Sequence, residues 1–116
     1  LEAGVVDWLV LKPAALGGVA VAWRIAEWAR ASGVQVAVTA FLDSAIGRMA
    51  ALQLAAALPD ASAAAGLATG SLLADDLAKI PDGASLAVPA AAGLGVIPDP
   101  VALARCRSGA SLDLAA

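Results

Sequence analysis

A short apolar run that ends on a lone lysine is the feature that most constrains this chain. Residues 8–11 are all apolar, and Lys12, Pro13, Gly17 and Gly18 follow them. A continuous run of this length, rather than an alternating one, predicts a parallel strand that is covered on both faces. Lys12 would then lie at the carboxyl end of the strand, which is where α/β folds carry their chemistry.

Strand and helix signals alternate after this start. Residues 5–12 predict the first strand, and Pro13 ends it because proline has no amide hydrogen to donate. Residues 14–18 predict a turn, and the apolar stripe over residues 18–31 predicts a helix. The β-branched run over residues 34–39 predicts a second strand. Strand, helix and strand in this order indicate a parallel pair joined by a right-handed crossover.

A second helix is predicted over residues 45–58, where Arg48 and Gln53 are the main polar residues. A helix that is apolar nearly all round should be buried on more than one side. Asp43 or Ser44 could cap its first turn, because a carboxylate or hydroxyl oxygen can accept hydrogen bonds from the amides left unpaired there. That structural role competes with any functional role for these two residues.

The next segments carry weaker signals. Residues 66–70, with glycine at both ends, predict a short third strand or a tight loop that approaches a ligand. Residues 71–77 predict a helical turn, on which Asp75 and Asp76 would not share a face, so we interpret them as a solvated rim rather than a carboxylate pair. Residues 86–89 predict an edge strand.

The C-terminal part of the chain is predicted to be an extension of the preceding units. A short helix is expected over residues 100–105, with proline in its first turn, and a frayed tail from residue 108. We therefore divide the chain into residues 1–82, which hold the strand and helix units, and residues 83–116, which pack back toward them.

The composition indicates a part of a larger unit. Of the 116 residues, 61% are hydrophobic and only 15% are charged, against about a quarter charged in ordinary soluble domains. Such a chain has too little polar surface to cover itself. Much of its apolar area is therefore expected to lie against other protein, and a homo-oligomer is one arrangement that would cover it.

Charge and residue usage exclude several function classes. A membrane-spanning helix needs about 20 apolar residues, and charges such as Lys12 and Arg48 interrupt the candidate runs. A net charge of −3 without a basic stripe argues against nucleic-acid binding. Histidine is absent and Cys106 is the single cysteine, so neither a Cys/His zinc site nor a Ser-His-Asp triad is present. The cytoplasm is the expected compartment.

Three polar positions are expected to converge. We place Lys12, residues 39–44 and residues 66–69 at the carboxyl ends of three parallel strand units, and the carboxyl ends of neighbouring parallel strands meet at one edge. A lysine in an apolar setting there could stabilise a developing oxyanion or give up a proton. The alternative is a surface lysine at a strand end. The proline and glycines that follow favour the functional interpretation, although for the glycines themselves we favour a tight turn over an anion site.

Four segments carry a resemblance to a known family. In chain order they are LKPAALGG (11–18), VTAFLDSAIG (38–47), GLATGSLLADD (66–76) and VPAAAGLGVIPD (88–99). Together they resemble the C-terminal part of o-succinylbenzoate synthases, which are members of the enolase superfamily. The resemblance implies an α/β fold, namely about strands 6 to 8 with their helices from a (β/α)7β barrel similar to a TIM barrel, followed by a C-terminal extension.

The resemblance also implies a reaction and a site. Lys12 matches a sixth-strand lysine whose ammonium stabilises the charged intermediate as 2-succinyl-6-hydroxy-2,4-cyclohexadiene-1-carboxylate is dehydrated to 2-succinylbenzoate, in bacterial menaquinone biosynthesis. The implied contacts of this small-molecule carboxylate substrate are Thr39, Asp43, Ser44, Gly66 and Leu67. Thr39 and Gly66 would act largely through their backbone. The family's Mg²⁺ is held by carboxylates on earlier strands, so the implied partners of this segment are those strands and the N-terminal cap.

Two other functions stay open. An N-acylamino acid racemase or dipeptide epimerase of the same superfamily also uses a lysine on this strand, and an assay with both substrate types would distinguish it. A non-catalytic fragment that acts only in association belongs to a different class, and the oligomeric state of the chain bears on it.

Overall fold

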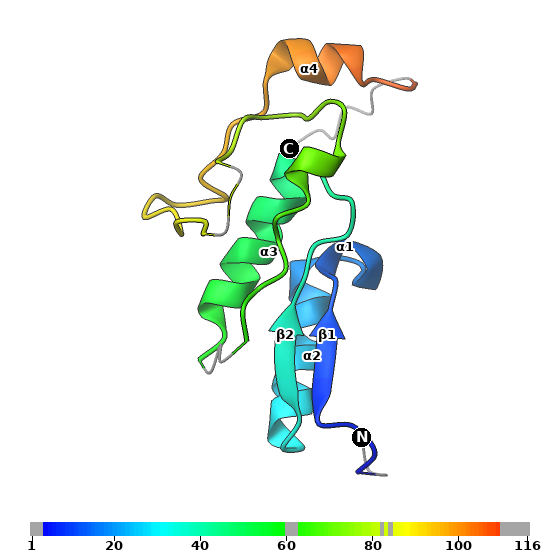
Figure 1. Ribbon diagram of the computed structural model, residues 1–116, viewed down its shortest axis with the longest axis vertical. Helices are drawn as coiled ribbons and strands as arrows, with labels where there is room; N and C mark the ends of the chain where they lie inside the picture. The colour runs from blue at the N-terminus through cyan, green and yellow to red at the C-terminus, as the bar shows by residue number, and fades with distance from the viewer. Residues whose placement is uncertain (1–3, 60–62, 82, 84, 110–116) are drawn as a thin grey trace, which may run out of the picture.

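The computed structural model describes residues 4–59, 63–81, 83 and 85–109. Its short strands lie beside two longer helices, and the C-terminal segment runs over one end (Figure 1). The elements in chain order are β1 (Trp8–Leu11), α1 (Pro13–Leu16), α2 (Val19–Ala31), β2 (Gln35–Val38), α3 (Ala45–Ala57), the 3₁₀ turn η1 (Gly70–Leu72) and α4 (Pro100–Arg105).

The two strands are parallel neighbours, as the strand, helix, strand order predicted. Their register pairs Trp8 with Gln35 and Leu11 with Val38. The predicted third strand is reduced to a single parallel bridge between Thr39 and Gly66. That bridge still brings a third segment to the carboxyl edge of the sheet.

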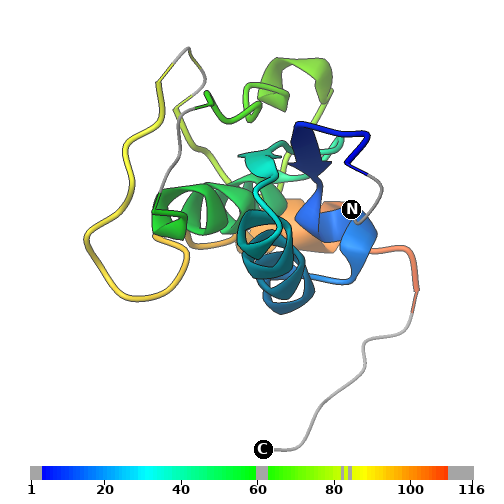
Figure 2. The same cartoon turned by 90° about the horizontal axis from the view of Figure 1, so that it is seen from below.

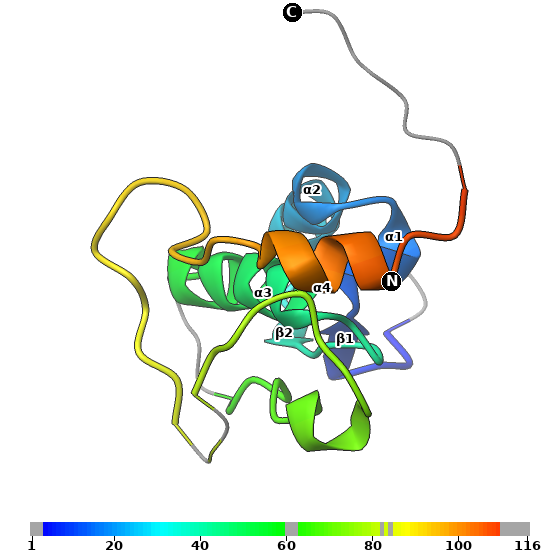
Figure 3. The ribbon, with the colours of Figure 1, turned by 90° about the horizontal axis from the view of Figure 1, so that it is seen from above.

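One face of the strands is covered by helices. Figure 2 shows α2 and α3 side by side on the same face, and Figure 3 shows the same arrangement from the opposite end. Leu11, Val36 and Val38 are buried there. The alternate residues Trp8 and Val10 are 43% and 55% exposed, because successive side chains of a strand point to opposite faces. Within the described residues β1 is therefore covered on one face only, and cover of its other face stays a prediction.

The segment after β1 is helical where a turn was predicted. Pro13 opens the one-turn helix α1, since its fixed φ suits a first helical position. Gly17 and Gly18 then have φ values of 95° and 114°, a region that side chains with a Cβ rarely adopt. The glycines make the tight turn that the sequence favoured. α2 follows at once, and Gly33, with φ 76°, comes just after its end.

Helix α3 is buried on more than one side, as its composition predicted, but its cap was wrongly predicted. Neither Asp43 nor Ser44 accepts a hydrogen bond from the first turn of α3 through its side chain. Instead Oδ1 of Asp76 accepts from the backbone N of Ala45 at 2.7 Å. Asp43 is engaged elsewhere, because its Oδ2 accepts from the backbone N of Phe41.

The predicted helical turn over residues 71–77 is confirmed only for its first residues, and the predicted solvated rim only for Asp75. Only Gly70–Leu72 are helical, as η1. Asp75 and Asp76 lie in irregular backbone, so the rule for helical neighbours does not apply. Asp76 forms a 2.7 Å ion pair with the buried Arg48, and Asp75 pairs with Arg105.

The C-terminal part packs onto the preceding units without the predicted edge strand. Residues 85–89 are irregular, and Pro89 lies against Gly95, where an added Cβ would come within 2.2 Å of the proline ring. Leu86 and Val96 pack against the core. The final helix is confirmed as α4. The division between residues 82 and 83 stays a prediction, and the tail from residue 110 lies outside the described residues.

None of the described helices is long and apolar enough to cross a membrane.

Candidate functional site

Lys12 lies at the carboxyl end of β1, on the face that the helices leave open. Successive residues of a strand point to opposite faces, so Lys12 lies on the face opposite the core residue Leu11 and on the same face as the exposed Val10. The side chain is half-buried, and Nζ donates a hydrogen bond to the carbonyl oxygen of Ala40 at 3.0 Å. Nζ also lies 5.7 Å from the centroid of the Phe41 ring. The ammonium is therefore held against the loop that follows β2.

Thr39 and Gly66 lie at the same edge. The backbone N of Thr39 donates to the carbonyl oxygen of Leu11, the residue before Lys12, at 2.9 Å. The backbone N of Gly66 donates to Val38, and its carbonyl oxygen accepts from Ala40 at 2.9 Å. The ends of three segments thus meet, as the sequence predicted for neighbouring parallel strands.

These sheet bonds change how Thr39 and Gly66 could contact a ligand. Both backbone N–H groups are already donated within the sheet, so neither is free to bind a carboxylate. The hydroxyl Oγ1 of Thr39 is buried and has no hydrogen-bond partner among the described residues. It is therefore the donor that this position can offer. A Cβ added at Gly66 would lie 3.0 Å from Cγ2 of Thr39, so the glycine makes room for that side chain.

The other three predicted contacts are placed less directly. Leu67 is 4% exposed and belongs to the hydrophobic core, so its side chain faces away from solvent. Ser44 is half-buried at the start of α3, and its carbonyl oxygen accepts from the backbone N of Arg48. Asp43 accepts from the backbone N of Phe41 at 2.9 Å. A substrate contact by any of the three stays a prediction.

Phe41 is the residue of this edge that sequence reasoning missed. It is 59% exposed, and an exposed aromatic residue in a loop contributes to no helical or strand periodicity. The sequence signal that could have identified it is its position, because Phe41 is the single phenylalanine of the chain and lies two residues after Thr39.

The described residues do not fit a magnesium site. They contain no group of three or more Asp, Glu, Cys or His side chains placed to hold a metal ion. Asp43 has the carboxylate nearest to Thr39 in the sequence, and that carboxylate already accepts a hydrogen bond from the backbone N of Phe41. The described residues therefore offer no set of ligands for a divalent cation.

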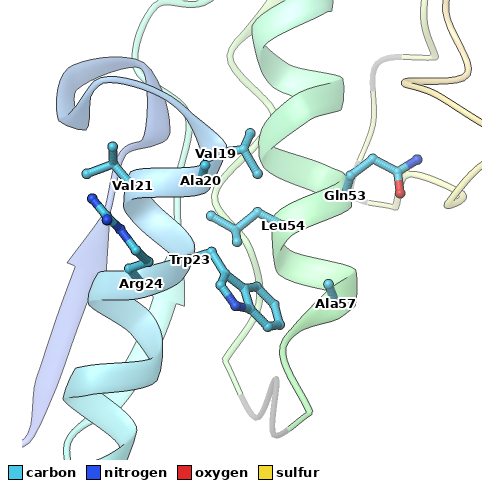
Figure 4. A pocket seen from close by; sticks show the side chains of 8 residues that line it. All are labelled: Val19, Ala20, Val21, Trp23, Arg24, Gln53, Leu54 and Ala57. Atoms are coloured by element: carbon cyan, nitrogen blue, oxygen red, sulfur yellow. The ribbon is translucent and has the colours of Figure 1, made fainter.

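A groove of about 990 Å³ lies elsewhere, between α2 and α3 (Figure 4). Its lining is mainly apolar, with Trp23 and Leu54 facing each other across it and Arg24 and Gln53 as the polar members. None of the predicted site residues lines it. It also lacks any carboxylate, thiol or hydroxyl among its lining residues, so it offers no acid or base for catalysis.

Comparisons with known proteins bear on the family and the fold of this chain. The family model "Enolase C-terminal domain-like" matches residues 1–102. An o-succinylbenzoate synthase of Mycobacterium marinum is 41% identical over 105 residues, which are 89% of this chain and 30% of that protein. The same enzyme of Mycolicibacterium smegmatis is 41% identical over 106 residues, 90% of this chain and 30% of that protein.

The solved muconate lactonizing enzyme from Pseudomonas putida superposes with a TM-score of 0.75 at 27% identity, covering 85% of this chain and 28% of that one. The chain thus spans about 30% of the length of the curated relatives named above. The fold class predicted from the sequence, α/β units of an enolase-type barrel, is confirmed. On these matches the chain belongs to the enolase C-terminal domain-like family.

Proposed function

We propose that this chain supplies Lys12 and part of the substrate pocket of an o-succinylbenzoate synthase, a lyase that dehydrates 2-succinyl-6-hydroxy-2,4-cyclohexadiene-1-carboxylate to 2-succinylbenzoate for menaquinone. The observation that carries the proposal is the place of the Lys12 ammonium, at the edge where β1, β2 and the Gly66 segment meet. The two relatives that carry the synthase name support the reaction assigned to it.

The ammonium of Lys12 is the charge that this part of the site contributes. Its bond to the Ala40 carbonyl and its position beside the Phe41 ring fix Nζ at the sheet edge. A fixed positive charge at that point stabilises the negative charge that develops on a carboxylate substrate when a proton is removed beside it. The buried hydroxyl of Thr39, the residue after β2, could donate to a second carboxylate.

The chain cannot form this pocket alone, so we propose that further polypeptide completes it. The two short parallel strands and one bridge of the described residues do not close a barrel. The remaining strands and the N-terminal cap would come from another segment, which would also hold Mg²⁺ as the resemblance implies. We further propose the cytoplasm as the compartment, on the single cysteine and the metabolic substrate.

The test is the synthase activity of the complete protein with Lys12→Ala. We expect kcat to fall about 10³-fold, the order found when a group that stabilises transition-state charge is removed, with the melting temperature little changed. Lys79→Ala is the matched control, since Lys79 is exposed and is the only other lysine of the chain. It should retain normal kcat.

Three results would contradict the proposal. The first is normal turnover by Lys12→Ala. The second is a wild-type protein that racemises N-acylamino acids or epimerises dipeptides and does not dehydrate the cyclohexadiene, which would favour the neighbouring function in the superfamily. The third is a complete protein that is inactive on all of these substrates, which would favour a role in association only.

A further inference from the structure

We propose that Phe41 determines the specificity of the Lys12 site for a cyclic carboxylate, and that Asp43 is the residue that positions it. The inference rests on the proposed function, because it takes the Lys12 ammonium as the group that meets the substrate. It goes beyond that function by assigning one wall of the pocket and by changing the role of Asp43 from a substrate contact to a support.

Phe41 is placed to form a wall beside the ammonium. The residue before it, Ala40, accepts the hydrogen bond from Nζ of Lys12, so backbone and ring both border the same charge. The ring centroid lies 5.7 Å from Nζ, within the range of a cation–π contact. The side chain is nevertheless 59% exposed. Much of the ring is therefore available to a ligand that approaches Lys12.

Asp43 fixes the backbone that carries the ring. Its Oδ2 accepts from the backbone N of Phe41 at 2.9 Å, which closes the loop between β2 and α3. The side chain of Asp43 rests on Gly47 in the first turn of α3, where an added Cβ would lie 2.8 Å from Cβ of Asp43. Only glycine at position 47 leaves room for the Asp43 side chain. The first turn of α3 thus contacts Asp43, Asp43 holds the backbone of Phe41, and the Phe41 ring lies beside Lys12.

This arrangement selects a ring-bearing anion. A carboxylate binds the ammonium, and an adjacent six-membered ring can pack on the exposed part of Phe41, which adds an aromatic contact beside the charge. A linear acyl chain would gain much less, because it has no flat face to lay against the phenyl ring. The site is thus suited to a cyclic unsaturated carboxylate more than to an acylated amino acid.

Binding of 2-succinylbenzoate to the complete protein, measured by calorimetry, tests the wall. We expect Phe41→Ala and Phe41→Leu each to weaken binding about fivefold, the effect of losing one aromatic contact, and Phe41→Tyr to bind nearly as wild type. Leucine keeps the apolar bulk, so normal binding by Phe41→Leu would overturn the claim that the ring matters. Trp28→Ala is the control, since Trp28 is an aromatic residue of α2 with nearly the same exposure, 58%.

A double-mutant cycle tests the support. If Asp43 acts only through Phe41, Asp43→Ala should weaken binding about as much as Phe41→Ala, and the double variant no further. Asp43→Asn should restore binding, because its amide oxygen can still accept from the Phe41 backbone N. Additive losses, or an Asp43→Asn variant as weak as Asp43→Ala, would show a direct contact and overturn the inference. Failure of the wild-type protein both to bind and to turn over would instead overturn the proposed function.

Discussion

At the scale of single residues, the hydroxyl of Thr39 carries a cost that a ligand could remove. Oγ1 is buried without a partner among the described residues, and an unsatisfied buried polar group destabilises a fold by about 1–3 kcal/mol. Thr39→Val removes the group and keeps the shape. We expect an unchanged or higher melting temperature in the complete protein, and binding of 2-succinylbenzoate weakened about tenfold, since hydrogen bonds to charged groups are the stronger ones.

Thr39→Ser is the matched variant, because it keeps the hydroxyl and loses only the methyl group. It should bind as the wild type does. If Thr39→Val also binds normally, the hydroxyl does not donate to the ligand, and the position contributes only its place in the sheet.

The residues of the site differ in how far the sequence could predict them. Lys12 was predictable because an apolar run ends on it, Thr39 because it ends the β-branched run, and Gly66 because it opens the third segment expected at the same edge. Phe41 was not, because its ring contact with Lys12 depends on the path of the loop. The role of Asp43 was ambiguous, since a carboxylate before a helix is usually a cap. Here it accepts a hydrogen bond from Phe41, which precedes it in the sequence.

At the scale of elements, α3 begins on a cap that comes from 31 residues further along the chain. Oδ1 of Asp76 accepts from the backbone N of Ala45, and Oδ2 accepts from Nη2 of Arg48, each at 2.7 Å. The arginine side chain is only 4% exposed. Gly70 packs on its guanidinium so closely that an added Cβ would lie 2.1 Å from it. One aspartate therefore ties the segment after Gly66 to the start of α3.

Asp76→Ala should destabilise the complete protein by about 3 kcal/mol near pH 7, because it removes the ion pair between Asp76 and the buried Arg48 and the side-chain cap of α3. Thermal unfolding measures this loss. Asp75→Ala is the control in the neighbouring residue, whose pair with Arg105 is solvent-exposed, and it should lower the melting temperature much less. Equal effects of the two variants would contradict the prediction.

The same contact predicts an acid dependence. Burial alone would raise the pKa of Asp76, but hydrogen bonds from Ala45 and Leu77 and the Arg48 guanidinium outweigh it, so the pKa lies below its ordinary value of 3.8. A lowered folded-state pKa adds stability above pH 3.8 that is lost as the pH falls through the lowered value. The stability lost by Asp76→Ala should therefore shrink below pH 3.8. A loss that stays constant down to the acid limit of folding would contradict this.

Elements were predictable where local sequence decides them. The strands and the helices α2, α3 and α4 follow from apolar patterning and from proline and glycine. The cap of α3 could not be predicted, because it depends on a distant residue that local rules do not reach. The edge strand over residues 86–89 failed for a similar reason, since Leu86 packs on the core and Pro89 on Gly95 in a loop.

At the scale of the whole molecule, the two strands have one face that the helices cover and one face that is exposed. The helices cover Leu11 and Val38, whereas Trp8 and Val10 on the opposite face are 43% and 55% exposed. The high apolar fraction predicted uncovered surface, although it could not show which face carries it. An exposed apolar patch favours association. The edges of an open two-stranded sheet also present unpaired backbone groups, which favours pairing with other strands.

The 116-residue chain, expressed by itself, should therefore self-associate through this face and elute in size-exclusion chromatography above its 11.3 kDa monomer mass. Replacing Trp8 and Val10 together by threonine should shift it toward monomer, because threonine suits a strand but buries less apolar area. Val101→Thr is the control, since Val101 on α4 is 68% exposed and lies outside the sheet. A well-behaved wild-type monomer, or an equal shift by Val101→Thr, would mean that the open face of the strands does not drive association.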